Sequence, residues 1–145
     1  MLLLSRTRER TADPVPATRP VAAMASVLTV GAGLALRAVA EGSVAKYGGD
    51  ALYTVLVLAL VVLLAPRVTP LTAAVSALVF SCAVEFLQLS DIPAELSQRS
   101  GIARLVLGST FNAPDLLWYA VGAAVGGLLH AAMRSFPGRR ASVRG

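Results

Sequence analysis

The sequence predicts an all-α protein: a four-helix transmembrane bundle with both termini in the cytoplasm. Apolar residues make up 56% of the chain, and they gather in four blocks instead of alternating with polar residues. At about 1.5 Å per residue, a block such as LTAAVSALVFSCAVEFLQL reaches nearly the thickness of the hydrocarbon core of a bilayer. Arginines flank these blocks, as is typical of residues that set membrane topology.

Charge and cysteine content exclude several classes of function. The formal net charge of +5 would suit a nucleic-acid partner. However, the arginines form no stripe on a soluble surface, so we expect no nucleic acid and take the lipid bilayer as the main partner. Cys82 is the one cysteine, which excludes an intramolecular disulfide and metal sites built on paired cysteines. We expect no cofactor and no metal site.

The first predicted helix covers about residues 21–38 and follows a basic tail, residues 1–20. Three prolines in this tail prevent a long helix, so we expect it to be disordered and cytoplasmic. Residues 38–40 have the small-x-small form of a signal-peptide cleavage site. The long basic segment before the helix and the position of Arg37, directly before that site, favour an uncleaved helix whose arginine reaches the interface.

A polar link, residues 41–49, is predicted to end in a flexible Tyr-Gly-Gly turn. Asp50 then begins the second helix, about residues 50–65, which stops at a proline. The third helix covers about residues 70–89. Because the connection between the two is tight, the second and third helices are expected to be antiparallel neighbours.

The longest link covers residues 90–113 and contains a short apolar run, residues 105–107. This run could lie at the interface or fold back into the mouth of the bundle. The fourth helix, about residues 114–133, begins where a cap-type asparagine is followed by a proline and an acid, which is a strong start signal. A basic cytoplasmic tail, residues 134–145, completes the chain and leaves residues 21–133 as the membrane domain.

The distribution of basic residues predicts the orientation of the bundle. The two tails and the link between the second and third helices carry most of them: Arg6, Arg8, Arg10, Arg19, Arg67, Arg134, Arg139, Arg140 and Arg144. The opposite links carry fewer, diluted by acids: Arg37, Lys46, Arg99 and Arg104 beside Glu41, Asp91 and Glu95. We therefore expect a multi-pass protein of the bacterial plasma membrane with both termini inside.

This topology places the unusual polar residues together at the outer end of the bundle. Glu85 lies within the third helix, where a carboxylate is expensive unless it faces protein or a wet cavity. The candidate polar pocket comprises Arg37, Asp50, Glu85, Gln88, Arg99, Arg104, Asp115 and Tyr119. On the fourth helix, Gly122 and Gly126 lie on the same face as Asp115 and Tyr119, and would let the third or first helix approach closely.

Each acidic residue also has a purely structural interpretation. Asp50 and Asp115 open helices, where an acid favours the helix dipole whatever the function. Glu85 could serve only as the ion-pair partner of an arginine. Both interpretations stay open from the sequence alone.

Four segments carry a resemblance to a known family: YGGDALY from residue 47, EFLQL from residue 85, LVLGSTF from residue 105 and DLLWYAVG from residue 115. Together they resemble the uncharacterised bacterial membrane family called domain of unknown function 2809, over about residues 46–129. That family usually has a tryptophan in the outer link where Ala-Glu-Leu stands here, at residues 94–96.

A looser similarity is to VanZ-like membrane proteins, which share a Glu-x-x-Gln helix followed by an Asp-led helix with glycines. The asparagine expected four residues after the aspartate is Tyr119 here. The two resemblances imply a fold and the location of a site, and they supply no reaction.

Three functional hypotheses follow. The pocket could bind a lipid-linked or amphiphilic envelope molecule, Glu85 could serve a small proton-coupled transporter or a membrane enzyme, or the polar groups could be ties within a structural or accessory subunit. An enzyme is the less favoured of these, because the sequence contains no nucleophile–base pair and no phosphate loop. Four helices scarcely enclose a pathway, so transport would favour a homo-oligomer or a partner protein.

Overall fold

The computed structural model describes residues 18–108 and 110–136, and within these ranges the chain is helical without strands. The helices are α1 (Thr18–Val39), α2 (Gly42–Leu64), α3 (Pro70–Leu87), α4 (Ile92–Arg99), α5 (Gly101–Leu107) and α6 (Ala113–Ser135). Four of them, α1, α2, α3 and α6, are long and apolar enough to cross a membrane. The prediction of an all-α fold with four spanning helices is confirmed. Most of both predicted tails lies outside the described residues.

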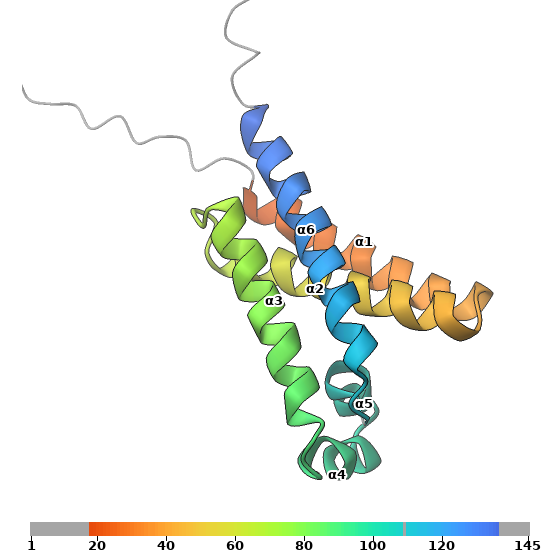
Figure 1. The fold of residues 1–145 in the computed structure, drawn as a ribbon. Helices are drawn as coiled ribbons and strands as arrows, with labels where there is room; N and C mark the ends of the chain where they lie inside the picture. The colour runs from red at the N-terminus through yellow and green to blue at the C-terminus, as the bar shows by residue number, and fades with distance from the viewer. Residues whose placement is uncertain (1–17, 109, 137–145) are drawn as a thin grey trace, which may run out of the picture.

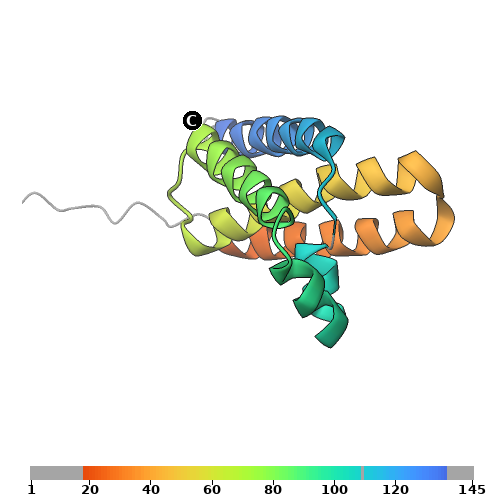
Figure 2. The ribbon, with the colours of Figure 1, turned by 60° about the horizontal axis from the view of Figure 1, so that its bottom comes forward.

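The four long helices form two antiparallel pairs that cross obliquely (Figure 1). One pair is the hairpin of α1 and α2, and the other is α3 beside α6. Figure 2 shows that α1 and α2 remain side by side when the molecule is turned. α2 is the central element, since it packs against α1, α3 and α6.

The helices alternate in direction, so the long connection lies at one set of helix ends. We call the region where α3 finishes and α6 begins, with α4 and α5 between them in the chain, the connector end. The turn from α1 to α2 lies to one side of it (Figure 1). In Figure 1, α4 and α5 lie at the bottom, and the described chain ends near the top. Four of the polar residues singled out from the sequence lie at the connector end: Glu85 and Gln88 where α3 finishes, and Asp115 and Tyr119 where α6 begins.

The predicted polar link at residues 41–49 is wrong, because helix α2 begins at Gly42 and includes most of that segment. The chain reverses at Gly42 itself, whose φ of 59° is easily reached only by glycine. Gly48, expected in the turn, lies inside the helix, and a Cβ there would come 2.5 Å from the Leu36 side chain. This glycine therefore lets α1 and α2 approach closely. Asp50 lies about two turns inside α2 and is not its cap.

The starts of α3 and α5 follow ordinary capping chemistry, whereas Asn112 before α6 makes no side-chain capping bond and donates its amide to Asp115 instead. Thr69 caps α3 by accepting a hydrogen bond from the backbone nitrogen of Thr72 at 3.2 Å, and Pro70 occupies the first turn. Asn112 is the residue before α6, which also has a proline in its first turn. The long link is largely helical, because Ser100 caps α5 directly after α4 ends.

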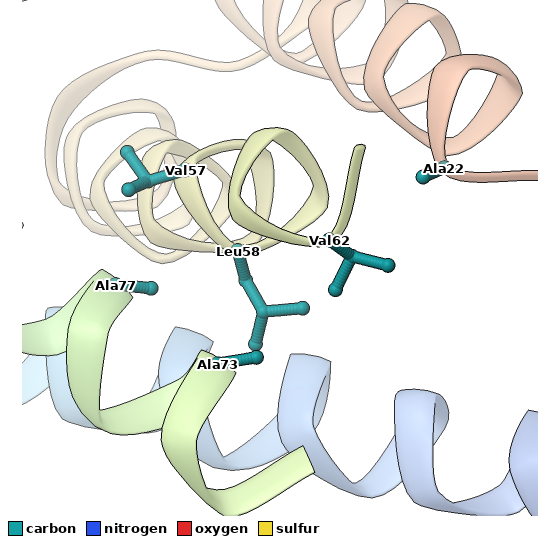
Figure 3. Packing of buried hydrophobic residues seen from close by; sticks show 6 residues of the cluster. All are labelled: Ala22, Val57, Leu58, Val62, Ala73 and Ala77. Atoms are coloured by element: carbon teal, nitrogen blue, oxygen red, sulfur yellow. The ribbon is translucent and has the colours of Figure 1, made fainter. Parts of the chain in front are cut away.

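The apolar core lies where α2 packs against α3 and α1. It consists of Ala22, Val57, Leu58, Val62, Ala73 and Ala77. Figure 3 shows the Leu58 side chain extending from α2 toward Ala73 of α3. The alanines allow close approach of the backbones, which is how helices gain packing energy in lipid. Outside this core many large apolar side chains are exposed, among them Met24, Val27 and Leu28 of α1 at 64%, 72% and 65%. A bilayer would cover such a surface.

Gly122 and Gly126 of α6 pack on α2, not on the third or first helix as predicted, whereas Gly127 packs on Ala74 of α3. A Cβ on Gly122 would overlap the backbone carbonyl of Ala51, and a Cβ on Gly126 would lie 3.0 Å from Leu58. The prediction named the wrong partner because α2 occupies the centre of the bundle, which spacing along α6 cannot reveal. The close approach itself is present.

Candidate functional site

Glu85 is completely buried and binds two groups from the start of α6. Its Oε2 accepts a hydrogen bond from the hydroxyl of Tyr119 at 2.9 Å, and its Oε1 accepts one from the backbone nitrogen of Asn112. The exposed fraction is 0% for Glu85 and 5% for Tyr119. A buried carboxyl group needs such donors, because an unpaired one costs several kcal/mol. Glu85 therefore joins the end of α3 to the beginning of α6.

Asp115 is the second buried acid and it binds Lys46 of α2. The Lys46 ammonium lies 2.5 Å from Asp115 Oδ2 and 3.6 Å from Asp50 Oδ2. The side-chain amide of Asn112 donates a hydrogen bond to the other oxygen of Asp115. Asn112 thus contacts both buried acids, one through its side chain and the other through its backbone.

These contacts form one connected network at the connector end, which we call the polar cluster: Lys46, Asp50, Glu85, Asn112, Asp115 and Tyr119. It joins α2, α3 and α6. The cluster contains three carboxyl groups and one ammonium group, and that ammonium group contacts two of the acids, Asp115 and Asp50. The cluster is therefore short of positive charge. An arrangement of this kind favours protons, cations or hydrogen-bond donors from outside.

A smaller polar contact continues the cluster into the bundle. The hydroxyl of Thr54 donates a hydrogen bond to the hydroxyl of Ser81 at 3.0 Å, and both residues are fully buried. Ser81 lies one turn before Glu85 on the same face of α3, as its spacing predicts. The contact is a neutral tie between α2 and α3, of the kind that holds membrane helices together.

Three side-chain atoms are buried without a hydrogen-bond partner among the described residues, and one of them is Oε1 of Gln88. The other two lie beside the cluster. They are Asp50 Oδ2 and the hydroxyl of Tyr53. The two residues are three apart on α2 and therefore share a face. The ring of Tyr53 lies 6.2 Å from the ring of Tyr119, so its hydroxyl belongs to the surroundings of the cluster. Such atoms call for a water molecule or a ligand group.

Gln88 binds the connector and makes no hydrogen bond to the polar cluster. Its side-chain nitrogen donates to the carbonyl of Leu107 at 2.5 Å, and Ser97 donates to the carbonyl of Gly108 at 2.8 Å. Gly108 has a φ of 63°, and a Cβ there would meet the Gln88 amide. Gln88 therefore anchors the turn after α5.

The three arginines of the predicted pocket are elsewhere. Arg37 and Arg104 line an open cleft between α1 and α5, and Arg99 is exposed in the last turn of α4. In the described part of the chain the ion pairs are Lys46–Asp50 and Lys46–Asp115, so no arginine is paired with an acid there. The cation of the cluster is Lys46, which the sequence analysis did not single out. Lys46 and Asp50 are four residues apart on α2, so their side chains share a face of the helix. The predicted start of this helix at Asp50 left Lys46 in the link and hid this spacing.

The described residues contain no group of three or more His, Cys, Asp or Glu side chains that could hold a metal ion. His130 lies at the opposite end of α6, where it is 2% exposed and its Nε2 is 3.3 Å from the carbonyl of Val68. Arg134 donates to the same carbonyl at 2.8 Å. Both side chains hold the α2–α3 turn and are separate from the cluster.

The chain matches a known protein family over more than half of its length. The model of the family described as protein of unknown function (DUF2809) matches residues 39–123. The chain belongs to the DUF2809 family. The matched range contains every residue of the polar cluster, so this DUF2809 protein carries its cluster within the part that defines the family. Neither the curated proteins nor the solved structures contain a match to the chain.

Proposed function

We propose that this DUF2809 protein, a multi-pass membrane protein, binds a lipid-linked or amphiphilic envelope molecule at the polar cluster, in the outer leaflet of the bacterial plasma membrane. The observation that supports this most is that two buried atoms lack a hydrogen-bond partner among the described residues: Asp50 Oδ2, which faces the Lys46 ammonium at 3.6 Å, and Tyr53 Oη. A headgroup with hydroxyl or amine donors would satisfy the carboxylate oxygen. Without a ligand or water these two atoms lower the stability of the bundle.

Lys46 is the residue through which a ligand could reach this site from the protein surface. Its side chain is 45% exposed although its ammonium contacts a buried acid, so the cluster reaches the surface at this residue. Val44 nearby on α2 is 66% exposed and apolar. An amphiphile could therefore place a polar headgroup at Lys46 and an apolar chain along α2.

The test is native mass spectrometry of the protein purified from its own membrane, wild type beside Tyr53→Phe. This substitution removes one oxygen atom that has no protein partner among the described residues, so the fold should be retained. Tyr47→Phe is the matched control, because Tyr47 stacks on Trp118 at 5.5 Å through its ring. We expect a retained lipid mass in wild type and Tyr47→Phe, and its loss or weakening in Tyr53→Phe. Equal retention in all three proteins would contradict the proposal.

A second candidate function is proton-coupled transport, or membrane enzyme activity, that uses Glu85. The specific observation is that Glu85 is fully buried and its described partners are neutral donors, a hydroxyl and a backbone nitrogen. An acidic side chain inside a spanning helix, with no cation among its described partners, is a candidate for a functional residue. In liposomes with a pH-sensitive dye, Glu85→Gln should abolish proton movement, and an unchanged signal would exclude this function. A Glu85→Gln protein that only dissociates or aggregates would instead favour the structural subunit.

A further inference from the structure

A separate cleft of about 650 Å³ opens between the end of α1 and α5. Its lining consists of Arg37, Ser100, Gly101, Ile102, Arg104 and Leu105. None of these residues belongs to the polar cluster. Sequence reasoning had placed Arg37 and Arg104 with Glu85, whereas the fold brings the two arginines to this cleft.

The charge of the cleft is entirely positive. Two of its lining residues are arginines from helices that are distant in the sequence, and no acidic residue lines it. Neither guanidinium group has a hydrogen bond or an ion pair with another described residue. Two cations that face the same space repel each other unless an anion lies between them. The cleft is therefore complementary to an anion.

The position of the cleft indicates which anion. Arg37 lies in the last turn of α1, a helix long enough to span the membrane, so its guanidinium belongs at the level of the lipid headgroups. The apolar side chains of Ile102 and Leu105, at the same cleft, are 75% and 59% exposed. They would cover the upper part of an acyl chain.

We propose that the Arg37–Arg104 cleft binds the phosphate group of an anionic membrane lipid. Arginine suits this role because its planar guanidinium donates two parallel hydrogen bonds to phosphate oxygens and keeps its charge at any physiological pH. The hydroxyl of Ser100, which accepts a hydrogen bond from the backbone nitrogen of Ala103, retains its own proton to donate. The site is independent of the one proposed at Lys46.

The experiment measures binding of phosphatidylglycerol to delipidated protein in neutral detergent, by native mass spectrometry, for wild type and for Arg37→Gln/Arg104→Gln. Arg99→Gln is the matched control, because Arg99 is exposed on the neighbouring helix and does not line the cleft. We expect the double variant to bind the lipid about tenfold more weakly or worse, as the loss of charge-assisted hydrogen bonds implies. The control should bind it like wild type.

A parallel titration with inorganic phosphate separates a lipid from a soluble phosphate. Loss of lipid binding in the double variant, with no binding of inorganic phosphate to wild type, supports the site and assigns it to lipid. Binding of inorganic phosphate that the double variant loses assigns the cleft to soluble phosphate and overturns the lipid assignment. Equal lipid binding by wild type, double variant and control overturns the proposal. Tyr53→Phe should leave this binding unchanged, so failure of one site is distinguishable from failure of the other.

Discussion

The hydroxyl of Tyr119 on α6 donates a hydrogen bond to Oε2 of Glu85 on α3, at 2.9 Å, with both side chains buried. This contact joins the two helices that flank the longest connection in the chain. It also explains how a carboxyl group is accommodated inside a helix that has no other charged side chain.

Replacing Tyr119 by phenylalanine should destabilise the bundle. The change leaves Oε2 of Glu85 buried without its donor, which costs roughly 1–2 kcal/mol of unfolding free energy. The measurement is unfolding in mixed detergent, followed by circular dichroism. Tyr47→Phe is the control for removal of a tyrosine hydroxyl. A Tyr119→Phe protein as stable as wild type would show that the contact contributes nothing.

Replacing Tyr53 by phenylalanine should stabilise the ligand-free protein, which is the opposite of the effect expected for Tyr119→Phe. The hydroxyl of Tyr53 is buried without a partner among the described residues, so its removal should raise the unfolding free energy by about 1 kcal/mol. The same unfolding assay on delipidated protein measures the change. A loss of stability would mean that the hydroxyl is satisfied in the free protein, for example by an ordered water.

Replacing Gly122 by alanine should separate α6 from α2. The added Cβ would overlap the carbonyl of Ala51, and overpacking of this kind costs about 1–3 kcal/mol. Gly49→Ala is the matched control: it also lies inside a spanning helix, and a Cβ there would meet no atom within 4 Å. The control should be as stable as wild type or more stable by up to about 1 kcal/mol, since alanine favours the helix. Equal effects of both substitutions would contradict the close packing of Gly122.

Removing the charge of Lys46 should destabilise the protein through Asp115. The Lys46→Met substitution leaves a nearly buried carboxylate without its cation, and because the lysine is half exposed we expect a cost of about 1–2 kcal/mol. Asp115→Asn in the same chain should restore part of that loss. A double-mutant cycle measured by unfolding gives the coupling, and additive effects would show that the two residues are not coupled.

The orientation predicted from the arginines can be tested with single cysteines in a Cys82→Ser background. Ser90 and Ser135 are both exposed, and they lie at opposite ends of the spanning helices. Neither substitution changes a charge. We expect a membrane-impermeant maleimide to label Ser90→Cys in spheroplasts and Ser135→Cys only after lysis. The reverse pattern would place both termini outside.

Much of the fold could be predicted from the sequence because lipid imposes simple requirements. A spanning helix must be long, apolar and internally hydrogen-bonded. The length and apolar composition of each of the four blocks therefore identify it as such a helix. The early start of α2 could not be predicted in this way. Residues 42–49 have a polar and glycine-rich composition typical of a turn, and they become helical because Gly48 admits α1 and Tyr47 stacks on Trp118.

The candidate site, like the fold, could be predicted from the sequence only in part. By itself the sequence determined that Glu85 would be unusual, since a carboxylate within a spanning helix is costly unless it faces protein or a wet cavity. For Asp115, at the start of a helix, the sequence left a structural role open. Only the tertiary structure decided their partners: Tyr119 and Asn112 for Glu85, and Lys46 for Asp115. It also moved Arg37 and Arg104 to a separate cleft. The physical reason is that the energy of a single residue in lipid depends on its type, whereas the choice of partner depends on how the helices cross.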